Sequence, residues 1–563
     1  MNASFQKLNI FTIVIIIFSF NALIVNAQPV TEEWVARYSH PGTNGSDQAR
    51  DLTTDNNGNI YVTGGSTRPG ASFDIVTIKY NSEGVEQWLA DYNHPDSLSD
   101  FGNAITVDKS GNVYVTGQSM VYTGLAHSDF LTIKYDQNGV EQWIARYDGP
   151  AEQSDFADDI AVDIMGNVYI AGRSTGDSTF VDLAVIKYNS NGVQQWVARY
   201  EGPGEEETKA LVVDDTGNVF VTAMSVSGSA GYDYITIKYN TNGEQQWLAR
   251  YNSPGNSNDE PNDITIDNQG NIYVVGTSTI AATGADYLTI KYNPGGLEEW
   301  AARYTGLNTT QSERGNAIAV DANGNVYVTG GSFGSTAGGF SDFATVKYNS
   351  NGEQQWASRY SYPVAGIDEA TCITIDNEGN VYVGGFSQSE TNNDYATVKY
   401  NADGLEQWVI RYNGSANNSD QINAIALDNV GNVIVTGTSR ATGSNEDYTT
   451  IKYSQKITGI DPGVNSVPET FFLYQNYPNP FNPATKIKYS IPAVETRHAS
   501  SLQRVSLIVY DILGNKVATL VNESKPAGTY EVEFNAEGLS SGMYFYQLTT
   551  EGFLSCKKMV IIK

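Results

Sequence analysis

Carboxylates recur at one fixed position along most of the chain. Eleven residues before the glycine of each Gly-Asn pair stand Asp47, Asp100, Asp155, Glu206, Asp259, Glu313, Asp368 and Asp420. Carboxylate oxygens bind Ca²⁺, so a ring of these residues near a channel mouth would attract cations or a polyhydroxyl ligand. The alternative is that each carboxylate caps its own loop by accepting backbone N–H bonds. Since an asymmetric site needs only one copy of its residues, eightfold recurrence favours the capping role.

The other reactive side chains form no catalytic constellation. The histidines are His40, His94, His127 and His498, and none of them lies in a metal or nucleophile motif. Cys372 and Cys556 lie far apart, and we expect each to be a small buried side chain rather than a nucleophile. We predict no catalytic residue, no metal motif and no cofactor, with Ca²⁺ at the acidic ring as the open possibility.

These side chains belong to a repeat of about fifty residues. Each Gly-Asn pair is preceded by an aspartate at three residues' distance, and these aspartates are Asp55, Asp108, Asp163, Asp214, Asp267, Asp321, Asp376 and Asp428. Asp-x-x-Gly suits a tight hairpin in which the carboxylate accepts backbone N–H bonds and glycine adopts positive φ. A calcium loop is the alternative, but the alternating ligands of a helical calcium hand are missing. A second hairpin follows, from a strand ending Lys-Tyr to a strand with tryptophan, so each unit has four antiparallel strands.

The phase of the tryptophans predicts the topology. Trp34 precedes the first Gly-Asn pair, whereas the last Lys-Tyr pair, at Tyr453, has no tryptophan strand after it. The first strand therefore matches what the last unit lacks, and adding it there removes exposed sheet edges. Abundant glycine, tyrosine and β-branched residues agree with an all-β protein. We predict an eight-bladed β-propeller closed by its N-terminal strand over residues 28–455.

Other recurring residues are assigned to the scaffold. Each unit has a serine after the second strand's glycine and an aspartate opening the third strand, and we expect hydrogen bonds among these Asp, Ser and Trp side chains within each unit. Arginine follows tryptophan by three residues in seven units, and Asp91 replaces the eighth. The loops between the second and third strands and between units vary, as residues 333–341 illustrate. Variable loops on a rigid scaffold favour recognition, so we expect that face to bind ligands.

The net charge and the terminal segments indicate which partners the protein has and where it is located. The formal net charge of −30 disfavours nucleic acids and anionic membranes as partners. Lys7, the apolar run after it and Val25-Asn26-Ala27 predict a signal peptide over residues 1–27, with an N-terminal membrane anchor as the alternative. Residues 456–469 predict a linker, and alternating strands with Gly and Asn turns predict a small Ig-like β-sandwich over residues 470–563.

Two resemblances follow from these motifs. GNVYVTGGS and DYLTIKYNPGGLEEW resemble the bacterial β-propeller repeat family SBBP, whose name suggests seven blades where the count here is eight. YPNPFNP, YDILGNKV, SSGMYFYQL and the terminal KKMVIIK closely resemble the C-terminal sorting domain (Por) of the type IX secretion system. The residues that carry this second resemblance are Tyr477, Pro478, Asn479, Pro480, Tyr510, Asp511, Gly514, Gly542, Lys557 and Lys558.

The sorting-domain resemblance implies partners and a location. It implies export through the periplasm, recognition by the type IX machinery and removal of the domain by a sortase-like peptidase, which leaves the protein secreted or at the cell surface. A retained Ig-like adhesion module is the alternative. For function, we expect a binding or adhesion scaffold for a polysaccharide or protein. An extracellular carbohydrate-active enzyme that uses carboxylates on the variable face is the alternative.

Overall fold

The computed structural model describes two compact units, residues 1–457 and 458–563. It describes residues 30–455 except 42–44, 69–71, 97, 123, 177–179, 228–229, 256, 281–283, 308–310, 335–339, 363–365 and 443–444. In the second unit it describes residues 472–473, 481, 483–492, 503–512, 514–526, 528–550 and 553–561. The predicted signal peptide and linker lie outside these residues. Every regular element in the described part is a β-strand, and no helix there is long and apolar enough to cross a membrane.

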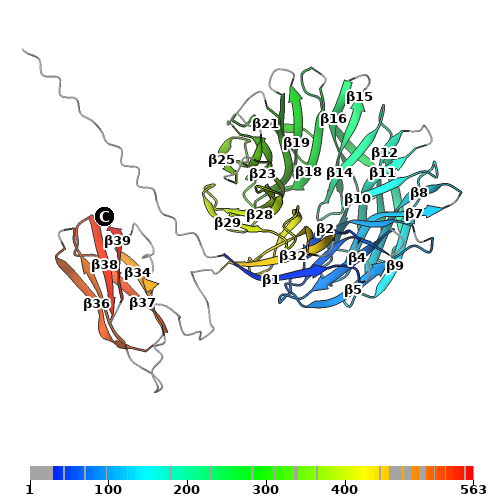
Figure 1. Ribbon diagram of the computed structural model, residues 1–563. Coiled ribbons are helices and arrows are strands. Elements are labelled where there is room, and N and C mark those ends of the chain that lie inside the picture. Colours follow the sequence, from blue (N-terminus) through cyan, green and yellow to red (C-terminus); the bar gives the residue numbers. More distant parts are fainter. Residues whose placement is uncertain are drawn as a thin grey trace, which may run out of the picture. The chain divides into compact units, whose positions relative to one another are not determined.

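In the first unit, the described strands form four-stranded antiparallel sheets, seven of which use consecutive strands (Figure 1). The first sheet contains β2 (Asp47–Thr54), β3 (Ile60–Thr67), β4 (Phe73–Tyr80) and β5 (Glu86–Tyr92). The second contains β6 (Asp100–Val107), β7 (Val113–Tyr122), β8 (Ala126–Tyr135) and β9 (Glu141–Tyr147). The third contains β10 (Asp155–Val162), β11 (Val168–Thr175), β12 (Val181–Tyr188) and β13 (Gln194–Tyr200). The next two contain β14 (Glu206–Val213), β15 (Val219–Ser227), β16 (Ala230–Tyr239) and β17 (Gln245–Tyr251); and β18 (Asp259–Ile266), β19 (Ile272–Ile280), β20 (Gly284–Tyr292) and β21 (Glu298–Tyr304).

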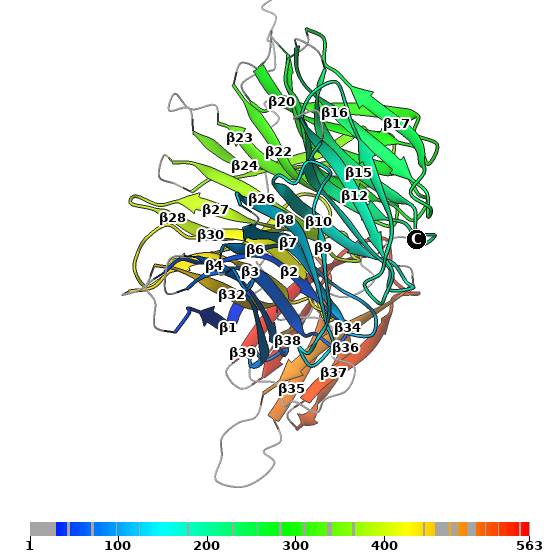
Figure 2. The same cartoon turned by 90° about the vertical axis from the view of Figure 1, so that its right-hand side faces the viewer.

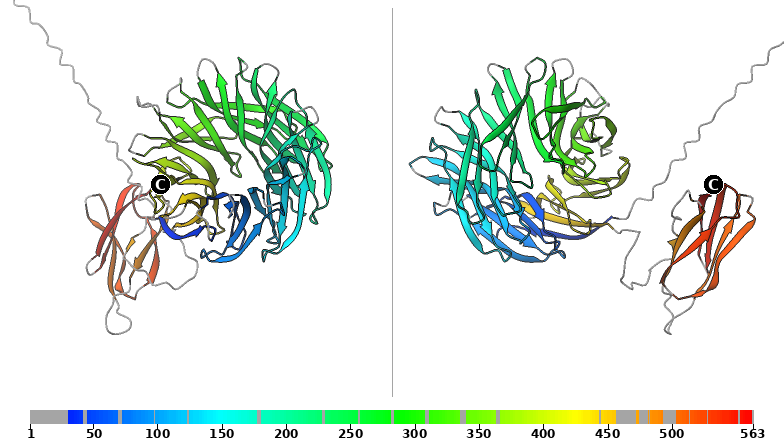
Figure 3. Two further views of the ribbon diagram at one scale, coloured as in Figure 1. Left: turned by 45° about the vertical axis from the view of Figure 1, so that its right-hand side comes forward. Right: turned by 180° about the vertical axis from the view of Figure 1, so that it is seen from behind.

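The remaining two consecutive sheets contain β22 (Glu313–Val320), β23 (Val326–Phe333), β24 (Ser341–Tyr348) and β25 (Gln354–Tyr360); and β26 (Asp368–Ile375), β27 (Val381–Gln388), β28 (Asn393–Tyr400) and β29 (Glu406–Tyr412). The last sheet joins both ends of the unit. It contains β30 (Gln421–Leu427), β31 (Val433–Arg440), β32 (Glu446–Gln455) and, as its outer strand, β1 (Val30–Tyr38). We call it the β1/β32 sheet. Val30 lies opposite Gln455 and Tyr38 opposite Tyr448, and β1 runs beside β32 in both views of Figure 3.

Each sheet packs against its neighbours in chain order (Figure 2). In addition, β2 packs against β30, β31 and β32 of the β1/β32 sheet. One apolar cluster accordingly unites Val62 and Ile78 of the first sheet with Ile434 and Tyr448 of the last. These repeated four-stranded sheets are consistent with the blades of a propeller. The predicted all-β class is thus confirmed.

The Asp-x-x-Gly turns have the predicted geometry. Asp55 Oδ1 accepts the backbone N–H groups of Asn57 and Asn59, each at 2.9 Å, and Gly58 has a φ of 76°. Gly84, in the second hairpin, has a φ of 76° as well, and a Cβ there would overlap the ring of Trp34. Glycine is therefore required at this second turn both by the backbone and by the indole packed on it.

The tryptophans make bonds that differ from the prediction. Seven indole Nε1 groups donate to a turn carbonyl of the following sheet at 3.0–3.1 Å, as Trp247 does to Pro294, rather than to Asp or Ser in their own sheet. The prediction of an Asp–Ser–Trp network was wrong because tryptophan occupies the outer strand, whose side chains reach the next sheet. Trp408 Nε1 is buried and has no hydrogen-bond partner in the described part, since no turn joins β32 to β1. There Lys399 bonds to the Gln455 side chain instead, at 2.5 Å.

Arginine takes the place expected for tryptophan in the network within each sheet. Arg199, for example, donates to Ser174 Oγ at 2.6 Å and to Asp182 at 2.7 Å, and all seven arginines of this position bond to the serine of their own sheet. In the first sheet, where Asp91 occupies the arginine position, Arg68 supplies the guanidinium from the neighbouring loop. It pairs with Asp74 at 2.7 Å and also with Asp91.

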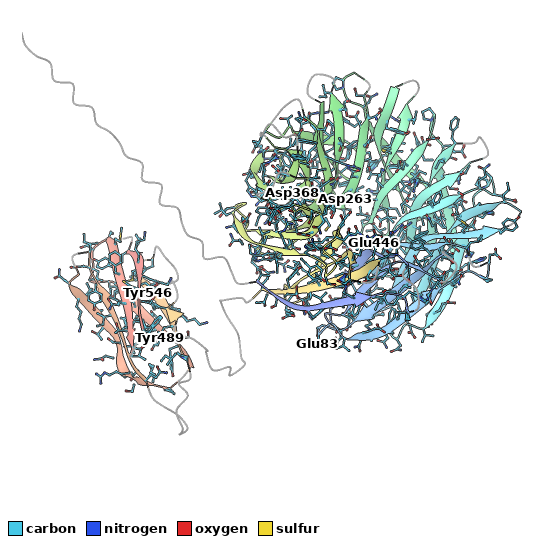
Figure 4. All side chains as sticks on the ribbon, in the orientation of Figure 1. Glu83, Asp263, Asp368, Glu446, Tyr489 and Tyr546 are labelled. Carbon is cyan, nitrogen blue, oxygen red and sulfur yellow. The ribbon has the colours of Figure 1, made fainter. Side chains whose placement is uncertain are left out.

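The second unit contains two sheets around one apolar core. One sheet has β33 (Phe472–Leu473), β34 (Ala484–Ile491) and β37 (Gly528–Asn535). The other has β35 (Gln503–Tyr510), β36 (Lys516–Lys525), β38 (Gly542–Thr550) and β39 (Phe553–Ile561). Tyr489 and Tyr546, labelled in Figure 4, come from different sheets and share this core.

Neither cysteine is fully buried. Cys556 is exposed, which corrects its predicted burial, because alternate residues of β39 point outward while Met559 and Ile561 point into the core. Cys372, on β26, is half-buried and free. Burial raises the pKa of its thiol to about 12, so it is a poor nucleophile at neutral pH.

In the first sheet Arg68 replaces the arginine that the other sheets have at the position of Asp91, and this replacement gives a stability prediction. We expect Arg68→Met to lower the free energy of unfolding by about 3 kcal/mol, because it leaves the buried Asp74 carboxylate without its cation. Adding Asp91→Arg restores the arrangement of the other sheets and is expected to recover most of that loss. Urea unfolding followed by tryptophan fluorescence measures both. The Lys209–Glu207 pair, whose carboxylate is far more accessible than that of Asp74, is the control: Lys209→Met should cost less than about 1 kcal/mol. A double variant no more stable than Arg68→Met would contradict the prediction.

Candidate functional site

The eight predicted acidic residues begin, or directly precede, the first strand of each sheet, and all are at most 1 % exposed. Asp420 shows their bonding: it accepts the N–H groups of Gly414 at 2.7 Å and Arg440 at 3.1 Å. Backbone N–H bonds of the same kind reach Asp47, Asp100, Asp155, Glu206, Asp259 and Asp368. Asp368 is labelled in Figure 4, among the sheets. These contacts are those of the capping role. A ligand-binding role for the ring stays a prediction.

Burial is the largest cause of raised pKa values at all eight positions. The pKa of Asp100 rises to about 6 and that of Glu313 to about 8. Glu313 stands out because the Asp286 carboxylate raises its pKa further and because its Oε2 atom has no hydrogen-bond partner in the described part. Its Oε1 atom accepts a long bond from Ser332 Oγ, at 3.5 Å.

A second set of carboxylates was missed by sequence reasoning. Asp51, Asp159 and Asp263 occupy the same position of β2, β10 and β18, and each accepts an N–H bond from the next sheet, as Asp263 does from Ile318 at 2.9 Å. Burial raises their pKa values to about 7, 6 and 7. The signal in the sequence was that aspartate alternates with alanine at this position: Ala104 and Ala210 occupy it in the two sheets that lie between these three. These carboxylates link neighbouring sheets.

One cluster breaks the repeat. His127, Asp129 and the exposed Asp148 each offer a ligand atom, and these atoms lie within 4.8 Å of one another. His127 and Asp129 belong to β8, and Asp148 follows β9. Burial and the Asp148 carboxylate raise the pKa of Asp129 to about 6. Sequence reasoning missed this group because its residues form no motif, although His127 is the one histidine at its position in the repeat.

The two ends of the sheets differ. At one end, which we call the turn end, the first-to-second and third-to-fourth strands are joined by five-residue turns such as 55–59 and 81–85. Hollows of about 340–650 Å³ lie between neighbouring turns there, and the recurring Asp, Asn, Lys and Tyr line them. Exposed apolar residues also recur at this end, at Val85, Val140, Val193, Leu297 and Leu405.

The opposite end, which we call the loop end, holds the remaining connections. These differ in length, from residues 228–229 to residues 305–312. Its exposed apolar side chains differ from sheet to sheet and include the aromatic rings of Tyr122, Phe180 and Phe340. Such variation is what a surface selected for particular ligands would contain.

The predicted sorting residues fall into two groups. Tyr477, Pro478, Asn479 and Pro480 lie outside the described residues. Tyr510 ends β35, and Asp511 accepts the N–H of Asn515 at 2.8 Å in a turn where Gly514 has a φ of 81°. Gly542 begins β38, and Lys557 and Lys558 lie on β39. The second group thus occupies neighbouring strands and a turn of the four-stranded sheet.

Glu313 gives a pH prediction. Its pKa in the folded protein, about 8, lies above the value near 4.5 of an exposed glutamate. Its contribution to stability is therefore full below about pH 4.5 and is lost as the pH rises through 8. We expect Glu313→Gln to gain stability relative to the wild type between pH 5 and pH 9. Calorimetric Tm values of both proteins test this, and a difference in Tm that does not change with pH would contradict it.

Comparison with known proteins found distant relatives. An uncharacterized WD repeat-containing protein of Acanthamoeba polyphaga mimivirus is 26% identical, over a match that covers 72% of this chain and 36% of that protein. The chain thus spans about a third of that relative's length. Solved structures include a protein of unknown function from Bacteroides caccae (12% identity, 53% of this chain and 94% of that one, TM-score 0.31) and a polysaccharide lyase described as an ulvan lyase (12% identity, 67% and 95%, TM-score 0.36). At these TM-scores, neither likeness identifies a function.

Family models match two parts of the chain and confirm both predicted resemblances. The beta-propeller repeat model SBBP matches residues 33–68, 96–121, 142–178 and 246–281. The model of the secretion system C-terminal sorting domain matches residues 475–563. The sorting domain implies interaction with the type IX secretion machinery and indicates export to the outer surface or the medium. The chain therefore contains beta-propeller repeats of the SBBP family and ends in a type IX secretion C-terminal sorting domain.

Proposed function

We propose that the protein is an exported binding scaffold: an eight-bladed propeller, closed by its N-terminal strand, that recognises a polysaccharide or protein ligand through its loop end. The observation that carries this proposal is that recurring and varying side chains occupy different places. The recurring Asp, Ser, Arg, Lys and Trp residues bond within the sheets or between them. The side chains that differ from sheet to sheet are exposed at the loop end.

The proposed closure rests on two observations. β1 pairs with β32 along its own length, from Val30 to Tyr38, and the first sheet packs against the β1/β32 sheet. The proposed processing completes the architecture: residues 1–27 are a signal peptide, 28–455 the propeller, 456–469 a linker, and 470–563 an Ig-like sorting domain that a sortase-like peptidase removes.

The exposed aromatic rings favour the loop end as the binding surface. Tyr122 and Phe180 are 64% and 46% exposed at the loop end. Large aromatic side chains combine a rigid apolar face with low conformational entropy, and for this reason they dominate many binding surfaces. Five of the exposed apolar residues of the turn end, Val85, Val140, Val193, Leu297 and Leu405, are aliphatic and recur at one position, so they offer less to distinguish one ligand from another.

A binding experiment tests the proposal. The purified full chain is applied to a glycan array, and each glycan bound is then assayed for released product. We expect binding without turnover. Affinity for the best glycan should fall about tenfold in Tyr122→Ala or Phe180→Ala, because an exposed ring that anchors a ligand contributes more than 1 kcal/mol.

The matched control is Val85→Ala at the turn end, which should bind as the wild type does. Equal losses in Val85→Ala and Tyr122→Ala would contradict binding at the loop end. Release of product would replace the scaffold by an extracellular carbohydrate-active enzyme. Absence of any glycan ligand would leave a protein as the partner.

Export gives a separate prediction. In a host that has type IX secretion, a chain ending at residue 457 should remain inside the cell, because it lacks the sorting domain. The full chain should appear at the outer surface or in the medium. Cell fractionation with an antibody against the first unit measures both, and full-length Tyr122→Ala is the control for expression. Equal export of the truncated chain would show that the C-terminal domain is dispensable.

A further inference from the structure

We propose that His127, Asp129 and Asp148 bind a divalent transition-metal ion such as Zn²⁺ at the loop end. The Nε2 atom of His127 lies 3.4 Å from Oδ1 of Asp129, and one ligand atom of each of the three residues lies within 4.8 Å of the others. Two ligands of one Zn²⁺, each bound at about 2.0–2.2 Å, lie about 3–4 Å apart. A small rotation of the exposed Asp148 side chain brings the group to that spacing.

The hydrogen bonds of His127 point to a ligand. Its Nδ1 atom lies 3.3 Å from the carbonyl oxygen of Leu125, so Nδ1–H donates to this carbonyl and Nε2 keeps its lone pair. This lone pair faces the Asp129 carboxylate. Neither Nε2 of His127 nor Oδ1 of Asp129 has a hydrogen-bond partner in the described part, and both residues are only 6% exposed. Two buried acceptors that face each other require a cation between them.

A proton on Nε2 of His127 is the alternative cation, and it needs fewer protein groups around it than a metal ion does. An imidazolium paired with Asp129 needs no third group. A metal ion needs at least three protein ligands, and Asp148 provides the third from a different loop. A bond from Nδ1–H to a backbone carbonyl is also the usual way in which a metal-binding histidine is oriented.

Comparison with the other sheets shows that this group is specific to one of them. Phe180 and Gly231 occupy the position of His127 in the next two sheets, and Asn93 and Asn252 occupy that of Asp148 in others. The scaffold arginine is also further away than in most sheets: Arg146 lies 3.5 Å from Asp129, whereas five other sheets have this pair at 2.7–3.1 Å and the β1/β32 sheet has it at 3.9 Å. Asp129 is thus less fully neutralised than its equivalents in those five sheets.

The ligand set decides which ion fits. Imidazole nitrogen suits Zn²⁺ and other first-row transition ions, while Ca²⁺ and Mg²⁺ prefer oxygen alone. Asp129 and Asp148 carry two negative charges against the single positive charge of Arg146, which favours a divalent ion. Because Asp148 is exposed, an ion here keeps a coordination position open to water or to a ligand. The site does not depend on the proposed binding function.

Calorimetric titration of the full chain tests the site. The protein is purified without a polyhistidine tag, stripped of metal with a chelator and titrated with ZnCl₂ or CaCl₂ at pH 7.5. We expect one Zn²⁺ per chain and at least about tenfold weaker binding of Ca²⁺. Asp148→Asn should weaken Zn²⁺ binding at least about tenfold, and it should fold normally, since asparagine occupies this position in other sheets.

His127→Phe, which copies Phe180 of the next sheet, should abolish the binding of Zn²⁺. His94→Asn is the control: His94 contacts Asp96 at 3.6 Å outside the group, and its loss should leave the affinity unchanged. Near-ultraviolet circular dichroism confirms that each variant is folded. If the wild type binds no Zn²⁺, or if Asp148→Asn binds it as tightly as the wild type does, the proposal is overturned and the proton is the cation.

Discussion

Every four-stranded sheet of the first unit has two faces to bury, and each face is buried against a neighbouring sheet. This constraint explains most of the recurring residues. Small residues and Val or Ile fill the contact, while the tryptophan of each outer strand reaches across it to a turn carbonyl of the following sheet. The lysine of the third strand donates to the same carbonyl, as Lys238 and Trp247 both do at Pro294. One backbone oxygen thus joins two side chains across each junction except the one at Trp408.

Sequence reasoning could predict the parts of the fold that repeat. The spacing of glycine, Lys-Tyr and tryptophan predicts four strands per unit, because turn chemistry and strand alternation act locally. The phase of Trp34 predicts the pairing of β1 with β32, since an unmatched strand at one end fits an absent one at the other. The partners of the side chains were harder to predict. Tryptophan was assigned to the network within each sheet, but the position of the outer strand directs it to the next sheet and leaves that network to arginine.

The candidate sites were predicted less well, for physical reasons. Recurrence made the eight carboxylates conspicuous, yet recurrence marks positions that the backbone itself requires, and their bonds to loop amides agree with this. His127 and Asp129 lie two residues apart on β8, and only the folded sheet brings Asp148, which follows β9, beside them. Their signal in the sequence is a departure from the repeat rather than a motif. In a protein built from repeated units, residues that depart from the repeat, such as Asp148 and Arg68, indicate where one unit differs from the others.

The junction at Trp408 bears on the order of folding. Seven junctions are fastened by a hairpin turn of the following sheet, and each such hairpin forms from residues close in sequence. The junction at Trp408 has no such hairpin, because β32 and β1 are the two ends of the unit, and within the described residues Trp408 Nε1 has no hydrogen-bond partner. Pairing of these strands must bring together residues more than 400 positions apart, and contacts of this kind form late and slowly. The pairing of β1 with β32 is thus expected to form last during folding and to open first under stress.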